Sequence, residues 1–525
     1  MRPGWILMAG LCAVATVLAA DLSWRTQPGH RVATVSPGTG KAGFQRMPSQ
    51  TTGITFTNVL GLSLSLTNTP VNNGSGVAVG DVDGDGLPEV YLCRLEGPNA
   101  FYRNRGDWRF EEVATTAGVA CPGQMSTGAV FADVDGDADL DLLVNALGGG
   151  TRLFLNQGSF RFTESIDSGL ARNTGATSMA LADIDGDGDL DLYVVHYRTS
   201  TILDQPQTRF SVAMVNGRPT LTKINGVPAT SPELADRFTL GPDGTPREAG
   251  EADRLYLNDG KGRFQHVPFA ERFRDAQGRP VSTPLDWGLA VQFRDLNQDG
   301  WPDLYVCNDT DSVDRIWIND GAGGFRPLDW TSVRHTSLSS MGVDVGDLNR
   351  DGWDDFFVTD MLGRRHLDRM VQLEKARPDP ALPGRGEDRL QFPRNTLFLN
   401  RGDGSYAEIA LMAGVAATEW SWTPLLLDVD LDGFEDLLIA NGFHRNVLDS
   451  DAARKMAQTK AAQRLTPVQE LELRRFFPEW ITPNLAYRNV GKGLGFAEVG
   501  REWGFDVMGV SNGMGEGDLD GDGDL

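Results

Sequence analysis

The segment DIDGDGDLDLYV at residues 183–194 decides the fold, because the chain repeats it. Similar segments are DVDGDGLPEVYL (81–92), DVDGDADLDLLV (133–144), DLNQDGWPDLYV (295–306), DLNRDGWDDFFV (347–358), DVDLDGFEDLLI (428–439) and the shorter DLDGDGDL (518–525). A second element follows six of them: an apolar run, then Asn, any residue, Gly and a nearby aromatic. Its Asn residues are Asn104, Asn156, Asn258, Asn319, Asn400 and Asn489. Asn and Gly both tolerate positive φ, so this element predicts a tight β-hairpin.

The spacing of the two elements defines a repeat unit of about fifty residues. The distance from each hairpin Asn to the next acidic segment is 29, 27, 37, 28, 28 and 29 residues. Three units are lengthened at the same place, roughly at 196–250, 359–393 and 441–484. Each unit reads as one apolar strand entering the acidic segment, one leaving it, and two more in the hairpin. Four short strands per unit predict an all-β fold, a seven-bladed β-propeller with three insertions, one of them helical.

The two ends of the chain are expected to close the ring. GITFTNV at 53–59 resembles the start of FEEVATTAGV at 110–119, so we expect it to complete the last blade. The seventh acidic segment has only its first eight positions, Asp518 to Leu525, so we expect the seventh blade to be incomplete. The predicted organisation is a signal peptide at 1–20, a linker at 21–50 and the propeller at 51–525.

The first twenty residues carry Arg2, an apolar run, and Ala19 and Ala20 before Asp21, which predicts a cleaved signal peptide and export to the cell envelope or beyond. A membrane anchor is the alternative, although the run is short for a bilayer span. Beyond the signal, the cysteines are Cys93, Cys121 and Cys307. They are too few for a disulfide framework, so we expect buried thiols, with a Cys93–Cys121 bridge left open.

The charge of the chain is concentrated in the acidic segments. The formal net charge is -24, which is the wrong sign for coating nucleic-acid phosphates and favours cations as partners. In the pattern DxDxDGxx[DE], side chains at positions 1, 3 and 5 converge, Gly at position 6 permits a sharp turn, and position 9 adds a carboxylate. Hard oxygen ligands at this spacing suit Ca²⁺. Without a cation, the packed carboxylates would repel one another by several kcal/mol per site.

The predicted Ca²⁺ ligands occupy positions 1, 3, 5 and 9 of each loop. They are Asp81, Asp83, Asp85 and Glu89; Asp133, Asp135, Asp137 and Asp141; Asp183, Asp185, Asp187 and Asp191; Asp295, Asn297, Asp299 and Asp303; Asp347, Asn349, Asp351 and Asp355; Asp428, Asp430, Asp432 and Asp436; and Asp518, Asp520 and Asp522. Ala138 replaces the position-6 Gly in the second loop, which is expected to be the weakest complete site. Position 12 is aliphatic in the six complete loops, which disfavours EF-hands, where it is Glu.

These loops resemble the FG-GAP or VCBS repeats of integrin α-subunit propellers. The order of acidic loop, Asn-x-Gly hairpin and FxEVAxxAGV strand resembles the bacterial relatives of cartilage acidic protein, over roughly residues 51–525. The resemblance implies a seven-bladed propeller with calcium in the blade loops, often followed by a C-terminal ASPIC/UnbV domain that is not visible in this sequence. It implies adhesion-like or matrix-like binding, and it does not imply a particular catalysed reaction for this chain.

The leading functional hypothesis is a calcium-stabilised module that binds a protein or glycan ligand through its insertions, because binding residues concentrate on loops held by a rigid scaffold. The alternative is a carbohydrate lyase or hydrolase, for which His196, Tyr197, Arg198 and Asp360 are the loose candidates. The third insertion contains LTPVQELELRRFF, in which Thr466, Pro467 and Gln469 predict a helix start. We expect this helix to pack on its own propeller, with a partner surface as the alternative.

Overall fold

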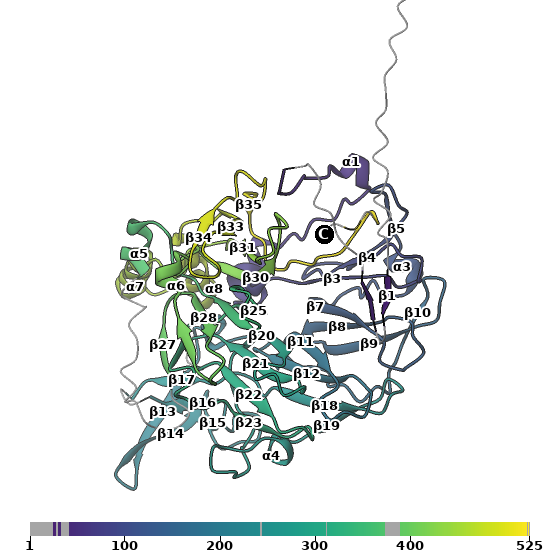
Figure 1. Cartoon of the computed structure of the whole chain (residues 1–525). Helices are drawn as coiled ribbons and strands as arrows, with labels where there is room; N and C mark the ends of the chain where they lie inside the picture. Colours follow the sequence, from purple (N-terminus) through teal and green to yellow (C-terminus); the bar gives the residue numbers. More distant parts are fainter. Residues whose placement is uncertain are drawn as a thin grey trace, which may run out of the picture.

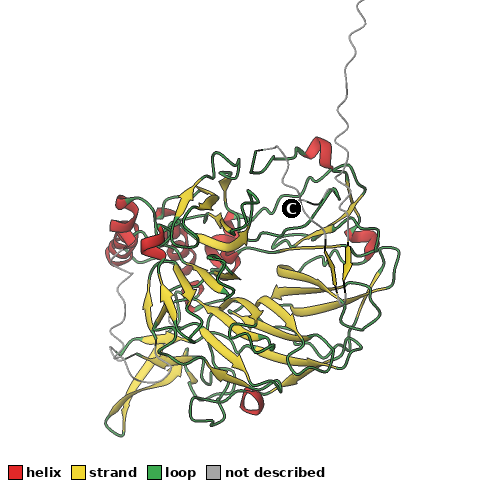
Figure 2. Cartoon of the chain, in the orientation of Figure 1, coloured by secondary structure: helices red, strands yellow, loops and turns green. Residues whose placement is uncertain are grey.

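The computed structural model describes residues 25–27, 30–32, 41–241, 244–310, 312–372, 389–521, 523 and 525. The predicted signal peptide at 1–20, nearly half of the predicted linker, part of the second insertion and Asp522 lie outside these residues. Strands dominate the described chain (Figure 2). They include six four-stranded antiparallel sheets, each built by one repeat with its strands in chain order.

The first three sheets come from the first half of the chain (Figure 1). They comprise β3 (Val77–Gly80), β4 (Glu89–Leu92), β5 (Ala100–Asn104) and β6 (Phe110–Glu112); β7 (Met125–Ala132), β8 (Asp141–Leu147), β9 (Gly150–Asn156) and β10 (Phe162–Glu164); and β11 (Ala176–Ala182), β12 (Asp191–His196), β18 (Arg254–Asn258) and β19 (Phe264–Val267).

The other three sheets follow the same order. They comprise β20 (Gly288–Arg294), β21 (Asp303–Asn308), β22 (Arg315–Asn319) and β23 (Phe325–Pro327); β25 (Gly342–Gly346), β26 (Asp355–Thr359), β28 (Thr396–Asn400) and β29 (Tyr406–Glu408); and β30 (Ser421–Leu427), β31 (Asp436–Asn441), β33 (Leu485–Asn489) and β34 (Phe496–Glu498).

Two features of the strands make these sheets a propeller. The second strand of a sheet is covered on both faces, and every residue of β8, β12, β21, β26 and β31 is buried, which explains their near-continuous apolar sequences. The first strands of successive sheets contact one another, from β3 through β7, β11, β20 and β25 to β30. The predicted all-β propeller is therefore confirmed; the count of seven blades stays a prediction.

The gap between the sixth and first sheets is filled on its inner side by the C-terminal segment. Asn512 accepts a hydrogen bond at its carbonyl from Thr423 Oγ1 (2.7 Å) and donates from Nδ2 to the carbonyl of Asn73 (3.3 Å). Farther along, Leu519 packs in the core of the first sheet. Residues 512–519 thus occupy the position that the first strand and acidic loop of a further blade would take.

The N-terminal segment covers the outer side of the same gap, but not as predicted. Residues 53–59 form no strand in the structure. Instead, Phe44 donates its N–H to the carbonyl of Trp503 (2.6 Å), as Phe264 does to Ser168 (2.7 Å) in the fourth strand of the third sheet. The element that substitutes for a fourth strand is therefore near Phe44, about ten residues earlier than expected.

A short helix then follows the Phe44 segment, as it follows the fourth strand elsewhere. Helix α1 (Ser49–Thr52) ends at Gly53 (φ 75°), and α3 (Ala114–Ala117) ends in the same way at Gly118 (φ 84°). Glycine is favoured at this left-handed position because it lacks a Cβ. The pattern AGV at 117–119 thus marks a helix end, and α6 (Ala410–Ala413) repeats it.

The three insertions lie at one end of the propeller. Successive strands are antiparallel, so the acidic loops and Asn-x-Gly hairpins lie at one end and the connections between second and third strands at the other. These connections carry η2 (Ile202–Asp204), β13 (Phe210–Val215), β14 (Arg218–Ile224), β15 (Val227–Pro228), β16 (Phe238–Leu240) and β17 (Pro246–Glu248); α5 (His366–Gln372) and β27 (Leu390–Phe392); and α7 (Ser450–Ala462), α8 (Pro467–Glu472), η3 (Leu473–Phe476) and β32 (Thr482–Pro483).

The third insertion packs on its own chain. Thr466 and Gln469 form the predicted capping box of α8. Arg474 in η3 then donates to the carbonyl of Leu66 (2.6 Å) in α2 (Leu62–Thr67) and pairs with Asp204 (3.1 Å) in the first insertion. The predicted packing of this helix on the propeller is confirmed.

The remaining elements are short connections. They are β1 (Arg25–Gln27), β2 (His30–Val32), η1 (Pro70–Asn73), α4 (Phe269–Arg272), β24 (His335–Ser337) and β35 (Met508–Gly509). Cys93, Cys121 and Cys307 are buried free thiols, so the bridge left open between Cys93 and Cys121 is not formed. Across the described residues, no helix combines the length and the apolar character needed to cross a membrane.

Candidate metal sites

Each acidic loop is a tight turn organised by its first aspartate. The two carboxylate oxygens of Asp81 accept from the N–H groups of Asp85 (3.1 Å) and Gly86 (2.9 Å). In every other copy the first aspartate also caps the loop with both oxygens, one accepting from the N–H at position 6 and the other from the N–H at position 4 or 5. These aspartates are Asp133, Asp183, Asp295, Asp347, Asp428 and Asp518. The repeated residue pattern therefore corresponds to one repeated conformation.

Position 6 explains the glycine in the pattern. Gly188 has φ 95°, and the other position-6 glycines have φ between 89° and 94°. Ala138 occupies this position in the second loop with φ 74°, a left-handed conformation that costs an alanine roughly 1–2 kcal/mol. Position 6 of the second loop is therefore strained; that this loop is the weakest complete site stays a prediction.

The position-9 carboxylate is buried beneath the loop. One oxygen of Asp141 accepts from the N–H of Val134 (3.2 Å) at position 2, and the other from the N–H of Asn156 (2.7 Å), the hairpin Asn of the same sheet. The same pair of bonds occurs at Glu89, Asp191, Asp303, Asp355 and Asp436. This carboxylate thus joins the acidic loop to the hairpin.

Burial changes the acidity of these groups. Removal from water raises the pKa of each position-9 carboxyl, and the neighbouring acidic side chains raise it further against the backbone hydrogen bonds. The pKa rises to about 7 for Glu89, Asp141, Asp191 and Asp303, to about 8 for Asp355 and to about 6 for Asp436. A cation in the loop would reverse this tendency by favouring the charged form.

The aspartate at position 3 has a carboxylate oxygen that could bind a cation. Among the described residues, Oδ1 of this aspartate is buried and has no hydrogen-bond partner in four loops, at Asp83, Asp135, Asp185 and Asp430. The other oxygen of Asp83 accepts from Arg103 (2.8 Å), and that of Asp430 pairs with Arg488. A buried carboxylate oxygen without a partner is costly, so these four loops fit a bound cation.

The acidic oxygens of these four loops also converge. One oxygen from each of three carboxylates lies within 4.8 Å of the others in the groups Asp81, Asp83 and Asp85; Asp133, Asp135 and Asp141; Asp183, Asp185 and Asp191; and Asp428, Asp430 and Asp436. Each group could hold a metal ion. Three of the four predicted ligands thus come together in each of these loops: positions 1, 3 and 5 in the first, and positions 1, 3 and 9 in the second, third and sixth.

The other loops differ at position 3 or at the edge of the described chain. Asn297 and Asn349 donate from Nδ2 to the position-5 carboxylates Asp299 and Asp351, each at 3.0 Å. An amide oxygen is still a possible ligand, but the local bond satisfies the position-5 oxygen. In the seventh loop, Asp518 caps the turn as elsewhere, and the predicted ligand Asp522 lies outside the described residues.

The hairpin asparagines have a role that the sequence did not suggest. Nδ2 of Asn156 donates to the carbonyl of Val82 (2.9 Å) in the acidic loop of the preceding sheet. The same bond to position 2 of the preceding loop is made by Asn258, Asn319, Asn400 and Asn489, and Asn104 makes it to Leu519 of the seventh loop. These side chains link neighbouring loops around the ring.

Three of the four side chains considered for catalysis have structural hydrogen-bond partners. Tyr197 donates to Asp309 (2.9 Å), and Arg198 donates to the carbonyls of residues 249 and 250. Asp360 accepts from the N–H groups of residues 338 and 339. His196 is 1% exposed, burial lowers its pKa to about 3, and its Nδ1 has no hydrogen-bond partner among the described residues.

The fold is a β-propeller in which each four-stranded repeat carries an acidic loop between its first two strands. The model of the FG-GAP-like repeat matches residues 81–144, 140–194 and 295–358. The chain therefore carries FG-GAP-like repeats, and it is similar to cartilage acidic protein 1, with 33% identity over 94 residues to the Homo sapiens protein and 31% over 94 residues to that of Xenopus tropicalis. The match spans 17% of this chain and 14% of either relative.

A solved lectin shows a weaker similarity. The lectin from Agrocybe aegerita, which specifically recognises non-reducing terminal N-acetylglucosamine, is 16% identical and aligns over 63% of this chain and 77% of its own, with a TM-score of 0.27.

Proposed function

We propose that this chain is an exported, calcium-binding propeller that acts as a binding module for a protein or glycan ligand, and not as an enzyme. The observation that carries the proposal is the buried, unpartnered position-3 oxygen, repeated in four loops beside two further carboxylates. Carboxylate oxygens at this spacing suit Ca²⁺. Up to one ion per loop would be bound by the residues at positions 1, 3, 5 and 9.

Calcium has a structural role in this proposal. The predicted ligands include 25 of the 72 Asp and Glu side chains, so their mutual repulsion opposes folding in the absence of cations. An ion that binds only the folded state stabilises it by mass action. The loops lie at the end opposite the insertions, which leaves the insertion end free to bind a ligand.

Export is supported by residues 1–20, whose basic residue, apolar run and terminal alanines are typical of a signal peptide. Millimolar calcium is available outside the cell, where weak extracellular sites are filled. The proposed location is therefore the cell envelope or the extracellular space.

Thermal unfolding tests the calcium proposal. The protein without residues 1–20 is heated in EGTA, in millimolar Ca²⁺ and in millimolar Mg²⁺ as the control. We expect a rise in Tm of ten degrees or more that is specific to Ca²⁺. Equal Tm values in the three buffers would show that the loops are turns that need no metal ion.

A further inference from the structure

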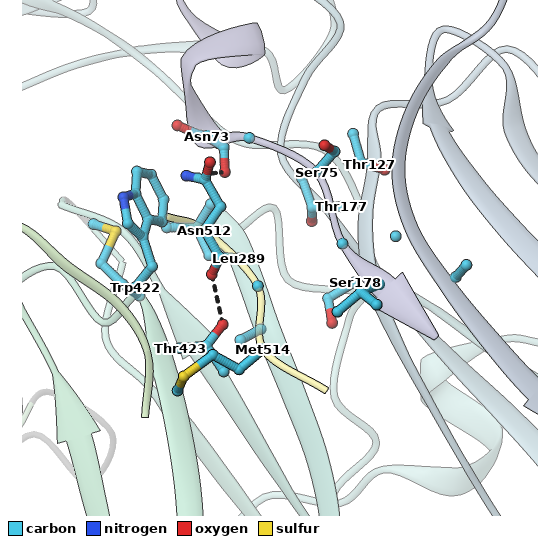
Figure 3. A pocket seen from close by; sticks show the side chains of 18 of the residues that line it. Asn73, Ser75, Thr127, Thr177, Ser178, Leu289, Trp422, Thr423, Asn512 and Met514 are labelled. Carbon is cyan, nitrogen blue, oxygen red and sulfur yellow. Dashed lines mark hydrogen bonds between the residues drawn. The ribbon is translucent and has the colours of Figure 1, made fainter. Parts of the chain in front are cut away.

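A cavity of about 230 Å³ lies on the propeller axis where the first strands begin, at the insertion end. Figure 3 shows its lining side chains. The residues five positions before each acidic loop are small, and Gly76, Gly128 and Gly513 are among those that line the cavity. Larger side chains there would close the axis, so the cavity is open because the repeat places small residues around it.

The residues six positions before the loops form the wall of the cavity. Strand pairing skips Thr127, Thr177 and Leu289 at register shifts, which are β-bulges. A bulge redirects a side chain and is common beside binding sites. Here it places one side chain of each bulged strand at the cavity.

The two sides of the cavity differ in chemistry (Figure 3). One side carries Trp422, Leu289 and Met514, and the other carries hydroxyls such as those of Thr127 and Ser178. The apolar side is suited to the C–H face of a ring, and the hydroxyl side is suited to hydrogen bonds.

Two of the lining hydroxyls are held in fixed orientations by bonds between sheets. Thr127 Oγ1 donates to the carbonyl of Ala176 (2.7 Å), and Thr177 Oγ1 to that of Gly288 (2.8 Å). Each of these hydroxyl oxygens can still accept from a ligand. The polar residue Asn73 also lines the cavity.

The lining excludes charged ligands. Lys, Arg, Asp and Glu make up 23% of the chain, yet none of them lines the cavity. A charge placed there would lose its hydration without a counter-charge, which is costly. The volume is below the roughly 300–1,000 Å³ of sites for drug-sized ligands, which limits the occupant to about one ring.

We propose that this cavity binds one uncharged sugar unit, with a C–H face toward Leu289, Trp422 and Met514 and hydroxyls toward Thr127, Ser178 and Asn73. The inference rests on the proposed function as a binding module, and it specifies a site and a ligand class for it. A neutral pyranose has the required chemistry because it combines an apolar face with several hydroxyl groups and carries no charge.

Ligand-observed NMR and calorimetry test the proposal in calcium buffer. The probes are D-glucose, D-galactose and N-acetyl-D-glucosamine, with D-glucuronate as the charged control. We expect at least one neutral sugar to bind with a millimolar or lower Kd, and glucuronate to bind at least tenfold more weakly. Ser178→Leu fills the cavity and is expected to weaken binding at least tenfold, whereas Ser63→Leu, on the exposed face of α2, leaves it unchanged.

A second variant separates loss of the sugar site from a folding defect in Ser178→Leu. Asn73→Leu removes a polar side chain from the lining and is expected to weaken sugar binding severalfold, while the Tm of both variants in calcium stays near that of the wild type. Absence of neutral sugar binding, equal binding of glucuronate, or binding that survives Ser178→Leu would each overturn the assignment. If the sugar site is refuted in this way, a Ca²⁺-specific rise in Tm and binding of another ligand would still support the proposed function as a calcium-binding module. Absence of the Ca²⁺-specific rise in Tm would refute that proposed function itself.

Discussion

Nδ2 of Asn104 lies 2.8 Å from the carbonyl oxygen of Leu519, although 415 positions separate the two residues. The first hairpin is thereby joined to the last acidic loop, as each other hairpin is joined to the loop before it. This hydrogen bond lies at the seam where the two ends of the chain meet. The same type of hydrogen bond therefore joins successive repeats within the chain and closes the ring between its two ends.

The seam bond should contribute measurably to stability. Asn104→Ala leaves the carbonyls of Leu519 and Pro88 without this donor, which we expect to cost about 1–3 kcal/mol. Hydrogen exchange should then rise in residues 512–521. The matched control Asn156→Ala removes the equivalent bond between the first two sheets and should leave exchange in 512–521 unchanged. Equal exchange there in both variants would contradict a specific role at the seam.

Local sequence patterns predicted the strands and the acidic loops because their determinants lie within a few residues of one another. Asp81 caps the N–H groups of residues only four and five positions away. The hydrogen bond from Asn104 to Leu519 could not be predicted in this way, since the two residues are remote in sequence. The closing segment near Phe44 was missed because its resemblance to a fourth strand is confined to one aromatic residue and the later Gly53. The axial cavity depends on bulges, which the sequence pattern does not indicate.

Position 3 should decide whether a loop binds an ion. Asp185→Ala removes the unpartnered oxygen of the third loop, and we expect one fewer Ca²⁺ per chain by equilibrium dialysis with elemental analysis. Asp185→Asn keeps an oxygen and should retain the ion more weakly, as the natural Asn297 and Asn349 suggest. The control Asp189→Asn changes a position-7 side chain, where the expected ligand is the backbone carbonyl. An unchanged ion count in Asp185→Ala would refute the ligand assignment.

The strained second loop should be improved by one substitution. Ala138→Gly removes the Cβ from a left-handed position and should raise the free energy of unfolding by about 1 kcal/mol, with tighter calcium binding. Ala457→Gly is the control, because this alanine is exposed within α7, where glycine should lower stability by about 1 kcal/mol. Denaturant titration of both variants measures the difference, and a loss of stability in Ala138→Gly would show that the loop is not strained.

The insertions should be held together by Arg474. Asp204 is 3% exposed at its side chain and also accepts from the N–H (2.9 Å) and Oγ1 (2.7 Å) of Thr69. Arg474→Ala removes the positive partner of this buried carboxylate, with an expected cost of about 3 kcal/mol and faster proteolysis of the first and third insertions. Arg475→Ala breaks an exposed pair with Glu472 and should change stability by less than about 0.5 kcal/mol. Similar proteolysis of the two variants would show that the ion pair between Arg474 and Asp204 does not hold the insertions together.

Calcium and protons should compete at position 9. Without metal, burial raises the pKa of these carboxyls above the unfolded value of about 4, to about 8 in Asp355. A raised folded pKa means that the stability contributed by the protonated group is full below pH 4 and is lost as the pH rises through the folded pKa. In EGTA, the Tm should therefore fall between pH 5 and pH 8.

Calcium should cancel this decline, because a bound cation favours the charged carboxylate. The Tm difference between millimolar Ca²⁺ and EGTA is therefore expected to widen from pH 5 to pH 8, as measured by calorimetry. Asp355→Asn, which removes the group with the pKa of about 8, should flatten the decline in EGTA near pH 7 to 8. A Tm in EGTA that stays level or rises over this range would mean that the buried carboxylates are stabilised without either a proton or a metal ion.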